Sequence, residues 1–226
     1  MNAGQEKWNA VDEFIGKTLL GSDPVLDAAL EASAAAGLPA IQVSPCQGKL
    51  LQLLAQIHKA RTILEMGTLG GYSTIWLARA LPPDGRLITL EVDENYAAVA
   101  RSNLSRAKLL NFVELRVGPA LESLPTLVEE GCGPFDLIFI DADKPSTSEY
   151  FQWALKLSRV GSLIIVDNVV RKGELADKTS SDPAVQGMRR FISLMGAEPR
   201  VSGTTIQTVG SKGYDGFSIA LVTAEV

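Results

Sequence analysis

Two short runs of the sequence are apolar at almost every position, and this feature limits the folds open to the chain more than any other. The runs are 135–140 (FDLIFI) and 162–166 (SLIIV). A strand that is apolar on both faces is covered on both sides, which is typical of a parallel sheet with helices above and below it. Three further strand patterns precede these runs, at 62–66, 86–92 and 113–117.

Helical patterns fill the intervals between the strand patterns. They lie at 73–81, 95–107, 120–130, 147–157 and 184–195. Because strands and helices alternate along the chain, we expect right-handed βαβ units and a doubly wound α/β sheet.

The last part of the sequence breaks this alternation. Two strand patterns, 204–209 and 217–222, follow one another without a helix, and residues 210–216 join them. This arrangement predicts a hairpin, so one antiparallel strand is expected at the end of an otherwise parallel sheet.

The N-terminal part of the chain is helical and contains no linker. We interpret residues 1–60 as helices, interrupted at Pro24, Pro39 and Pro45, that pack on the α/β core of residues 61–226. A length of 226 residues is typical of one domain, so a single domain over 1–226 is expected, with the helices near the mouth of its site.

Composition excludes several function classes. A net charge of −5 argues against a nucleic-acid partner. A single histidine, His58, nearly excludes a histidine-based metal site or a Ser-His-Asp triad, and Cys46 and Cys132 are too few for a disulfide framework. No apolar run is long enough to span a membrane and no signal-peptide core is present, so we expect a cytoplasmic protein.

A glycine-rich turn follows the first strand pattern. The segment 65–71 (EMGTLGG) leads to Ser73, a candidate N-cap, and Glu91 ends the next strand, where an acid can bind the hydroxyls of a ribose. The dinucleotide fingerprint is absent, because Leu69 replaces the glycine that lets a pyrophosphate approach. The turn therefore favours a nucleoside without phosphates, for which S-adenosylmethionine is the common candidate. A ligand-free βα turn is the alternative.

Acidic residues follow the fourth and fifth strand patterns. Asp141, Ala142, Asp143 and Lys144 come after the fourth, and Asp167 with Asn168 after the fifth. Ligands of doubly wound sheets bind beyond the carboxyl ends of the strands, so we expect Asp141, Asp167 and Asn168 to converge. Their oxygens suit Mg²⁺, Mn²⁺ or Ca²⁺. Capping of the following helices is the alternative interpretation.

Together these motifs resemble the cation-dependent class I O-methyltransferases, the group of caffeoyl-coenzyme A and catechol O-methyltransferases. The resemblance runs from about Gln42 to the C-terminus and is carried by four segments: 44–48 (SPCQG), 64–73 (LEMGTLGGYS), 139–144 (FIDADK) and 166–169 (VDNV).

The resemblance implies a seven-stranded methyltransferase fold, S-adenosylmethionine, a divalent cation (usually Mg²⁺), a catechol-like acceptor and a homodimer. For the metal it implies Asp141, Asp167 and Asn168. For the cofactor it implies Val43, near the methionine end, with Glu65, Gly67, Thr68, Ser73, Glu91, Ala120, Asp141 and Asp143.

Lys144 matches the general base that the resemblance implies. A catechol hydroxyl has a pKa near that of tyrosine, about 10, and chelation by a cation lowers it. The acids beside Lys144 favour its charged form, whereas a cation favours its neutral form, so roles as a base and as an electrostatic anchor both remain open.

One position departs from the resemblance. The family often has tryptophan three residues after the metal-binding asparagine, and this chain has Arg171. Arginine offers a planar fork of donors that favours a carboxylate, so we expect a preference for acceptors with an acidic tail, such as caffeate. Orientation of Arg171 to solvent is the alternative.

The main functional hypothesis is therefore a metal-assisted O-methyltransferase acting on small catechol-like phenols. A nicotinamide-dependent oxidoreductase and a non-catalytic nucleoside-binding module are the alternatives. The missing glycine counts against the first of these, and the complete set of metal ligands counts against the second.

Overall fold

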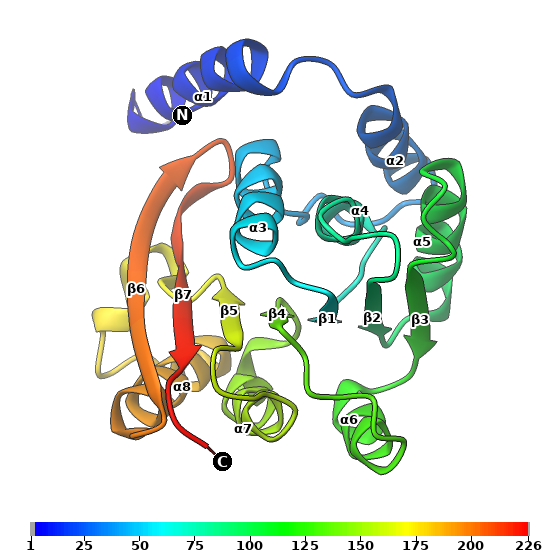
Figure 1. Ribbon diagram of the computed structural model, residues 1–226. Coiled ribbons are helices and arrows are strands. Elements are labelled where there is room, and N and C mark those ends of the chain that lie inside the picture. Colours follow the sequence, from blue (N-terminus) through cyan, green and yellow to red (C-terminus); the bar gives the residue numbers. More distant parts are fainter. Residues whose placement is uncertain (1–2, 226) are drawn as a thin grey trace.

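A computed structural model describes residues 3–225; positions 1, 2 and 226 of the predicted domain lie outside the described residues. A seven-stranded sheet in the order β3-β2-β1-β4-β5-β7-β6 forms its centre (Figure 1). The strands are β1 (Thr62–Met66), β2 (Arg86–Glu91), β3 (Val113–Val117), β4 (Leu137–Ile140), β5 (Leu163–Asp167), β6 (Val201–Gly210) and β7 (Gly213–Val222).

Strand direction matches the prediction from the sequence. Strands β1 to β5 pair in parallel, and β7 runs antiparallel to both β5 and β6. The doubly wound, mostly parallel sheet with one antiparallel strand is thereby confirmed.

Helices cover both faces of the sheet. In Figure 1, α2, α3, α4 and α5 lie on one face, and α6, α7 and α8 lie on the other. The helices and single turns are α1 (Ala3–Ile15), η1 (Gly16–Leu20), α2 (Pro24–Ala35), α3 (Pro45–Ile57), α4 (Tyr72–Ala78), α5 (Glu94–Arg106), α6 (Ala120–Glu129), η2 (Lys144–Ser146), α7 (Thr147–Lys156), η3 (Arg171–Ala176) and α8 (Pro183–Ala197).

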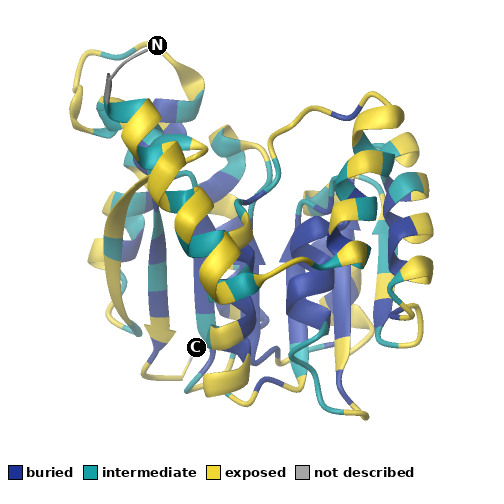
Figure 2. Ribbon diagram, turned by 90° about the horizontal axis from the view of Figure 1, so that it is seen from above, coloured by how far each residue is buried: buried dark blue, intermediate teal, exposed yellow. Residues whose placement is uncertain are grey.

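Each central strand supplies side chains to two separate hydrophobic cores. In β4, Leu137 and Phe139 enter the core shared with α2 to α4, whereas Ile138 and Ile140 enter the core shared with α6 to α8. Successive side chains of a strand point to opposite faces, so a strand covered on both sides is apolar throughout. Figure 2 shows the resulting buried centre.

The N-terminal helices begin where the sequence predicts breaks. Pro24 and Pro45 occupy the first turns of α2 and α3, and Asp23 and Ser44 cap those helices through their side-chain oxygens. Helix α1 differs from the others, because no side chain that the structure describes in it is buried (Figure 2). Within residues 3–225, none of the helices combines the length and apolar character needed to cross a membrane.

The C-terminal hairpin is longer than the sequence predicts. Strands β6 and β7 pair as far as Gly210 and Gly213, so most of the predicted 210–216 linker is strand and only two residues form the turn. Gly213 has a φ of 93°, a value that glycine adopts easily, and it lets β7 start directly after the turn.

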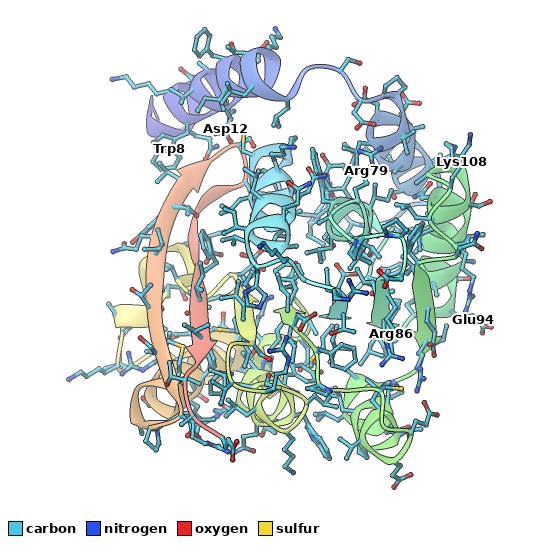
Figure 3. The ribbon with its side chains drawn as sticks, viewed as in Figure 1. Trp8, Asp12, Arg79, Arg86, Glu94 and Lys108 are labelled. Carbon is cyan, nitrogen blue, oxygen red and sulfur yellow. The ribbon has the colours of Figure 1, made fainter. Side chains whose placement is uncertain are left out.

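The tip of this hairpin forms hydrogen bonds with two N-terminal segments. Asp12 on α1 accepts a hydrogen bond from the Ser211 backbone N–H at 2.7 Å, and Figure 3 labels Asp12 beside the tip. Lys212 Nζ donates to the Ala40 carbonyl at 2.6 Å. Residue 40 belongs to the loop between α2 and α3, so this contact links the hairpin to the segment that leads into the site.

Candidate active site

A cavity of about 650 Å³ lies beyond the carboxyl ends of the parallel strands, where doubly wound sheets bind their ligands. It spans the ends of β1, β2, β3 and β4 and the loop before α3. Its lining includes Ile41, Gln42, Val43, Gly67, Leu69, Tyr72, Ser73, Glu91, Tyr96, Gly118, Ala120, Leu121, Asp141, Asp143, Lys144, Tyr150, Asn168 and Arg171.

Gly67 brings two neighbouring strands together at the floor of the cavity. Its φ is 97°, and a Cβ atom there would lie 2.8 Å from the carbonyl carbon of Asp141 and closer still to the carbonyl oxygen. The sequence suggested that glycine makes room for a ligand at this turn. The structure shows that Gly67 also makes room for the backbone of β4, which sets the position of Asp141.

The predicted cap of the following helix is wrong. Gly71, with a φ of 80°, is the N-cap of α4, and Ser73 lies inside the helix. The Ser73 hydroxyl donates instead to Glu65 Oε1 at 2.7 Å. A buried carboxylate needs hydrogen-bond donors, and the Ser73 hydroxyl is oriented toward Glu65 because it supplies one of them.

Glu65 lies behind the cavity wall and does not border the cavity. It is fully buried, and its carboxylate accepts hydrogen bonds from the hydroxyls of Ser73, Thr74 and Thr89 at 2.5–2.7 Å. Burial raises its pKa to about 7, although the three hydroxyls act in the opposite direction. Glu65 therefore fixes the start of α4 against β1 and β2.

Glu91 borders the cavity and also shapes the glycine turn. Its Oε2 accepts the backbone N–H groups of Thr68 at 3.2 Å and Leu69 at 2.7 Å, and its Oε1 accepts that of Asp93 at 3.0 Å. Thr68 itself is buried, and its hydroxyl lies 2.6 Å from that of Thr89, away from the cavity. Glu91 is therefore a rigid acceptor at one end of the cavity.

The remaining predicted cofactor residues lie along the cavity wall. Val43 is buried just before α3, and Ala120 begins α6. Asp143 accepts hydrogen bonds from the Tyr150 hydroxyl and from the Ser146 backbone N–H, the latter at 3.2 Å. Burial and the charge of Asp143 raise the pKa of Tyr150, so it remains a neutral hydroxyl at neutral pH.

Asp141 and Asp167 lie on adjacent strands at the other end of the cavity. Ile140 of β4 is in register with Val166 of β5, so the two acids that follow are neighbours. Burial, and next the charge of Asp141, raise the pKa of Asp167 to about 7. Asn168 follows with a φ of 56° and lines the cavity. The structure therefore brings the three predicted metal ligands together, with Asp167 behind the wall.

This donor set fits a hard divalent cation. Asp167 is buried beside Asp141, whose charge is, after burial itself, the second cause of the raised pKa of Asp167, and Lys144 Nζ lies 2.7 Å from Asp141 Oδ1. Residues 3–225 contain no cluster of three or more His, Cys, Asp or Glu side chains suited to a metal. The set differs from such clusters because its third donor is the Asn168 amide, and carboxylate and amide oxygens suit Mg²⁺ or Ca²⁺.

The cavity also contains residues that sequence reasoning missed. Tyr72, Tyr96 and Tyr150 line it, although the sequence assigned none of them a role; Tyr72 lies within the segment 64–73. Gln47 hydrogen-bonds to the Asp167 side chain and lowers its pKa, opposing the effect of burial. The segment 44–48, noted for its resemblance, was the available signal for Gln47.

The chain is similar to known proteins over most of its length. Residues 20–220 match the O-methyltransferase family. The catechol O-methyltransferase of Niastella koreensis is 58% identical over 215 residues, covering 95% of this chain and 97% of that protein. The catechol O-methyltransferase of Mycobacterium tuberculosis is 54% identical over 212 residues, covering 94% of each.

Solved structures with bound cofactor are equally similar. The O-methyltransferase from Bacillus cereus in complex with SAH (S-adenosylhomocysteine) has a TM-score of 0.96 and 59% identity, over 97% of this chain and 100% of that one. The O-methyltransferase TomG from Streptomyces achromogenes, in complex with SAM (S-adenosylmethionine), has a TM-score of 0.95 and 52% identity, over 99% and 100%. With this fold, this cavity and these relatives, the chain belongs to the O-methyltransferase family.

Proposed function

We propose that this chain, acting as one domain over residues 1–226, transfers a methyl group from S-adenosylmethionine to a hydroxyl of a catechol-like phenol, assisted by a divalent cation. The observation that carries the proposal is one cavity with two chemically different ends. Glu91 marks one end, and Asp141 with Asn168 marks the other. The relatives named catechol O-methyltransferase support the same acceptor class.

The Glu91 end suits the nucleoside. Glu91 lines the cavity, and backbone N–H groups hold its carboxylate in place. Its oxygens can therefore accept hydrogen bonds from the two hydroxyls of a ribose without reorganisation. Ala120 and Tyr150 provide the apolar walls for a base, and Val43 lies toward the methionine end. Glu65 and Thr68 act indirectly, because they hold the turn in shape.

The Asp141 end suits the acceptor. Asp141, Asp167 and Asn168 would hold a divalent cation, which would act as a Lewis acid and lower the pKa of a catechol hydroxyl from about 10. Lys144 Nζ has three N–H groups and uses one for Asp141, so two remain for an acceptor oxygen. Lys144 therefore orients that oxygen toward the methyl group and stabilises its negative charge.

Turnover of a mixed catechol panel, with and without EDTA, tests the proposed function. Asp141→Asn and Asp167→Asn should lower turnover at least 100-fold while S-adenosylhomocysteine still binds, because each replaces a charged metal ligand with a neutral amide. Glu149→Gln is the matched control, since Glu149 is exposed and outside the cavity. Full activity of either aspartate variant in EDTA would contradict the metal assignment.

The nicotinamide alternative receives less support. No glycine stands at position 69, and the similar structures with a named ligand hold SAM or SAH. Titration with NADH and with S-adenosylmethionine separates the two functions: tight binding of NADH alone would contradict the methyltransferase.

A homodimer and a reducing, cytoplasmic setting complete the proposal. Phe14 and Leu19 are 70% and 75% exposed, and monomers rarely leave large apolar side chains grouped on one short segment. Cys46 and Cys132 are both free thiols, which suits a reducing compartment. Light scattering of wild type and Phe14→Glu tests the dimer, and cell fractionation tests the compartment.

A further inference from the structure

Arg171 is an arginine without a counter-ion that borders the acceptor end of the cavity. Its buried Nε atom has no hydrogen-bond partner, and its side chain forms no ion pair with the residues that the structure describes. Two other partly buried arginines differ. Arg79 pairs with Asp23 at 2.5 Å, and Arg116 pairs with Glu114 at 2.6 Å. A guanidinium that is partly removed from water needs an anion or acceptor, so Arg171 lacks a partner that a ligand can supply.

The backbone around Arg171 is held in an unfavourable conformation. Arg171 and Lys172 have φ values of 53° and 57°, in the left-handed region that side chains disfavour. Asp215 Oδ1 on β7 accepts the backbone N–H groups of Val170 at 3.0 Å and Arg171 at 2.9 Å. Such strain persists where surrounding contacts enforce it, and it clusters at ligand-binding segments.

Charge is distributed unevenly along the cavity. Glu91 and Asp143 are the lining acids at the cofactor end, whereas both lining cations, Lys144 and Arg171, stand at the acceptor end together with the lining acid Asp141. Lys144 is neutralised by Asp141 at 2.7 Å. Arg171 is therefore the lining cation, among the described residues, whose side chain forms no ion pair with a protein carboxylate.

We propose that Arg171 binds a carboxylate on the acceptor, so that the enzyme prefers catechols with an acidic tail over neutral ones. This inference rests on the proposed function. The planar guanidinium can donate two parallel N–H bonds to a carboxylate, which an amide or a hydroxyl of the same size does not match. Asn168 lies three residues earlier on the same loop, and both residues line the cavity.

A pair of matched acceptors tests the proposal. Caffeate and caffeamide have the same shape and differ in the charge of the tail, so the ratio of their kcat/KM values isolates that charge. Wild type should favour caffeate roughly five-fold, the scale of a partly exposed charge contact, and Arg171→Gln should bring the ratio close to one. Arg171→Lys should restore part of the preference, because it keeps the charge but loses the fork.

Lys172→Gln is the matched control, because Lys172 is exposed and does not border the cavity. Its ratio should equal that of wild type. An equal fall in Lys172→Gln would overturn the proposal, since the general positive field would then explain the preference. The proposal would also be overturned if Arg171→Gln had the same ratio of kcat/KM for caffeate to kcat/KM for caffeamide as wild type.

Calorimetry separates this proposal from two other outcomes. If Arg171→Gln weakens S-adenosylmethionine itself, Arg171 binds the cofactor carboxylate and the proposal is overturned. If wild type methylates no catechol, the proposed function fails. Binding of caffeate and caffeamide to the protein saturated with S-adenosylhomocysteine still decides for or against Arg171: tighter caffeate binding that Arg171→Gln abolishes supports it, and equal binding overturns it.

Discussion

Replacement of Gly67 by alanine should destabilise the protein more than its small size suggests. Two effects add at this position. The φ of 97° lies in the region that costs an L-residue about 1–2 kcal/mol, and the new Cβ atom would lie within 2.8 Å of the Asp141 carbonyl carbon. The Asp141 backbone cannot rotate away as a side chain can, so β1 and β4 must separate. Overpacking of this kind costs about 1–3 kcal/mol.

The expected loss is therefore about 2–5 kcal/mol of unfolding free energy. For a chain of this size, 1 kcal/mol shifts the Tm by about 2–4 °C, so Gly67→Ala should melt roughly 4–20 °C below wild type. Gly37→Ala is the matched control. Gly37 has a φ of 76°, and a Cβ atom added there would meet nothing within 4 Å, so this variant carries the conformational cost without the clash.

Thermal unfolding by circular dichroism measures both variants beside wild type. We expect Gly67→Ala to lose at least twice as much stability as Gly37→Ala. The same displacement should move Asp141 and lower catechol turnover in the folded fraction. Equal destabilisation of the two variants would refute the reasoning, because the close approach of β1 and β4 would then add nothing to the loss of unfolding free energy.

Three further predictions concern the site. Glu91→Ala should weaken S-adenosylmethionine by about 1.5–3 kcal/mol, the scale of hydrogen bonds to a charged group, and unchanged affinity by calorimetry would contradict the ribose assignment. The pKa of Glu65 rises from 4.5 to about 7 on folding, so the folded state binds more protons between these values and stability should fall as pH rises from about 4.5 to 7, by at most about 3 kcal/mol. Glu65→Gln should flatten this slope in urea titrations at several pH values, and an unaltered slope would contradict the assignment. Lys212→Met removes the donor to the Ala40 carbonyl and should weaken S-adenosylhomocysteine by about 1 kcal/mol, whereas Lys178→Met, on an exposed loop, should have no effect.

The central strands could be predicted from the sequence to within one or two residues. Ranges 62–66 and 113–117 coincide with β1 and β3, because each pattern is followed directly by a glycine, Gly67 or Gly118, at which the strand ends. Strand β6 was predicted too short. Its residues are mostly exposed and polar, so it has no apolar pattern, and its length follows from pairing with β7.

Part of the site could also be predicted, for a topological reason. Parallel strands end at one edge, so motifs such as Asp141 and Asp167 that follow strands must meet there. Contacts between distant side chains could not be predicted. The demand of the buried Glu65 for donors determines where the Ser73 hydroxyl points, and no spacing in the sequence encodes that demand.

The hairpin tip has a consequence for the order in which the chain is assembled. The hydrogen bonds that join Gln5, Asp12 and Ala40 to residues 210–212 span 205, 199 and 172 positions of the sequence. During synthesis from the N-terminus, α1 and the loop at residue 40 leave the ribosome long before β6 and β7 exist. Contacts of such high sequence separation also close long loops, which costs conformational entropy and slows folding. The loop at residue 40, which borders the cavity, therefore gains its hydrogen bond to Lys212 only after β6 and β7 have formed. Before that point, a nascent chain contains the cofactor and metal motifs, but this loop is not yet held over the cavity.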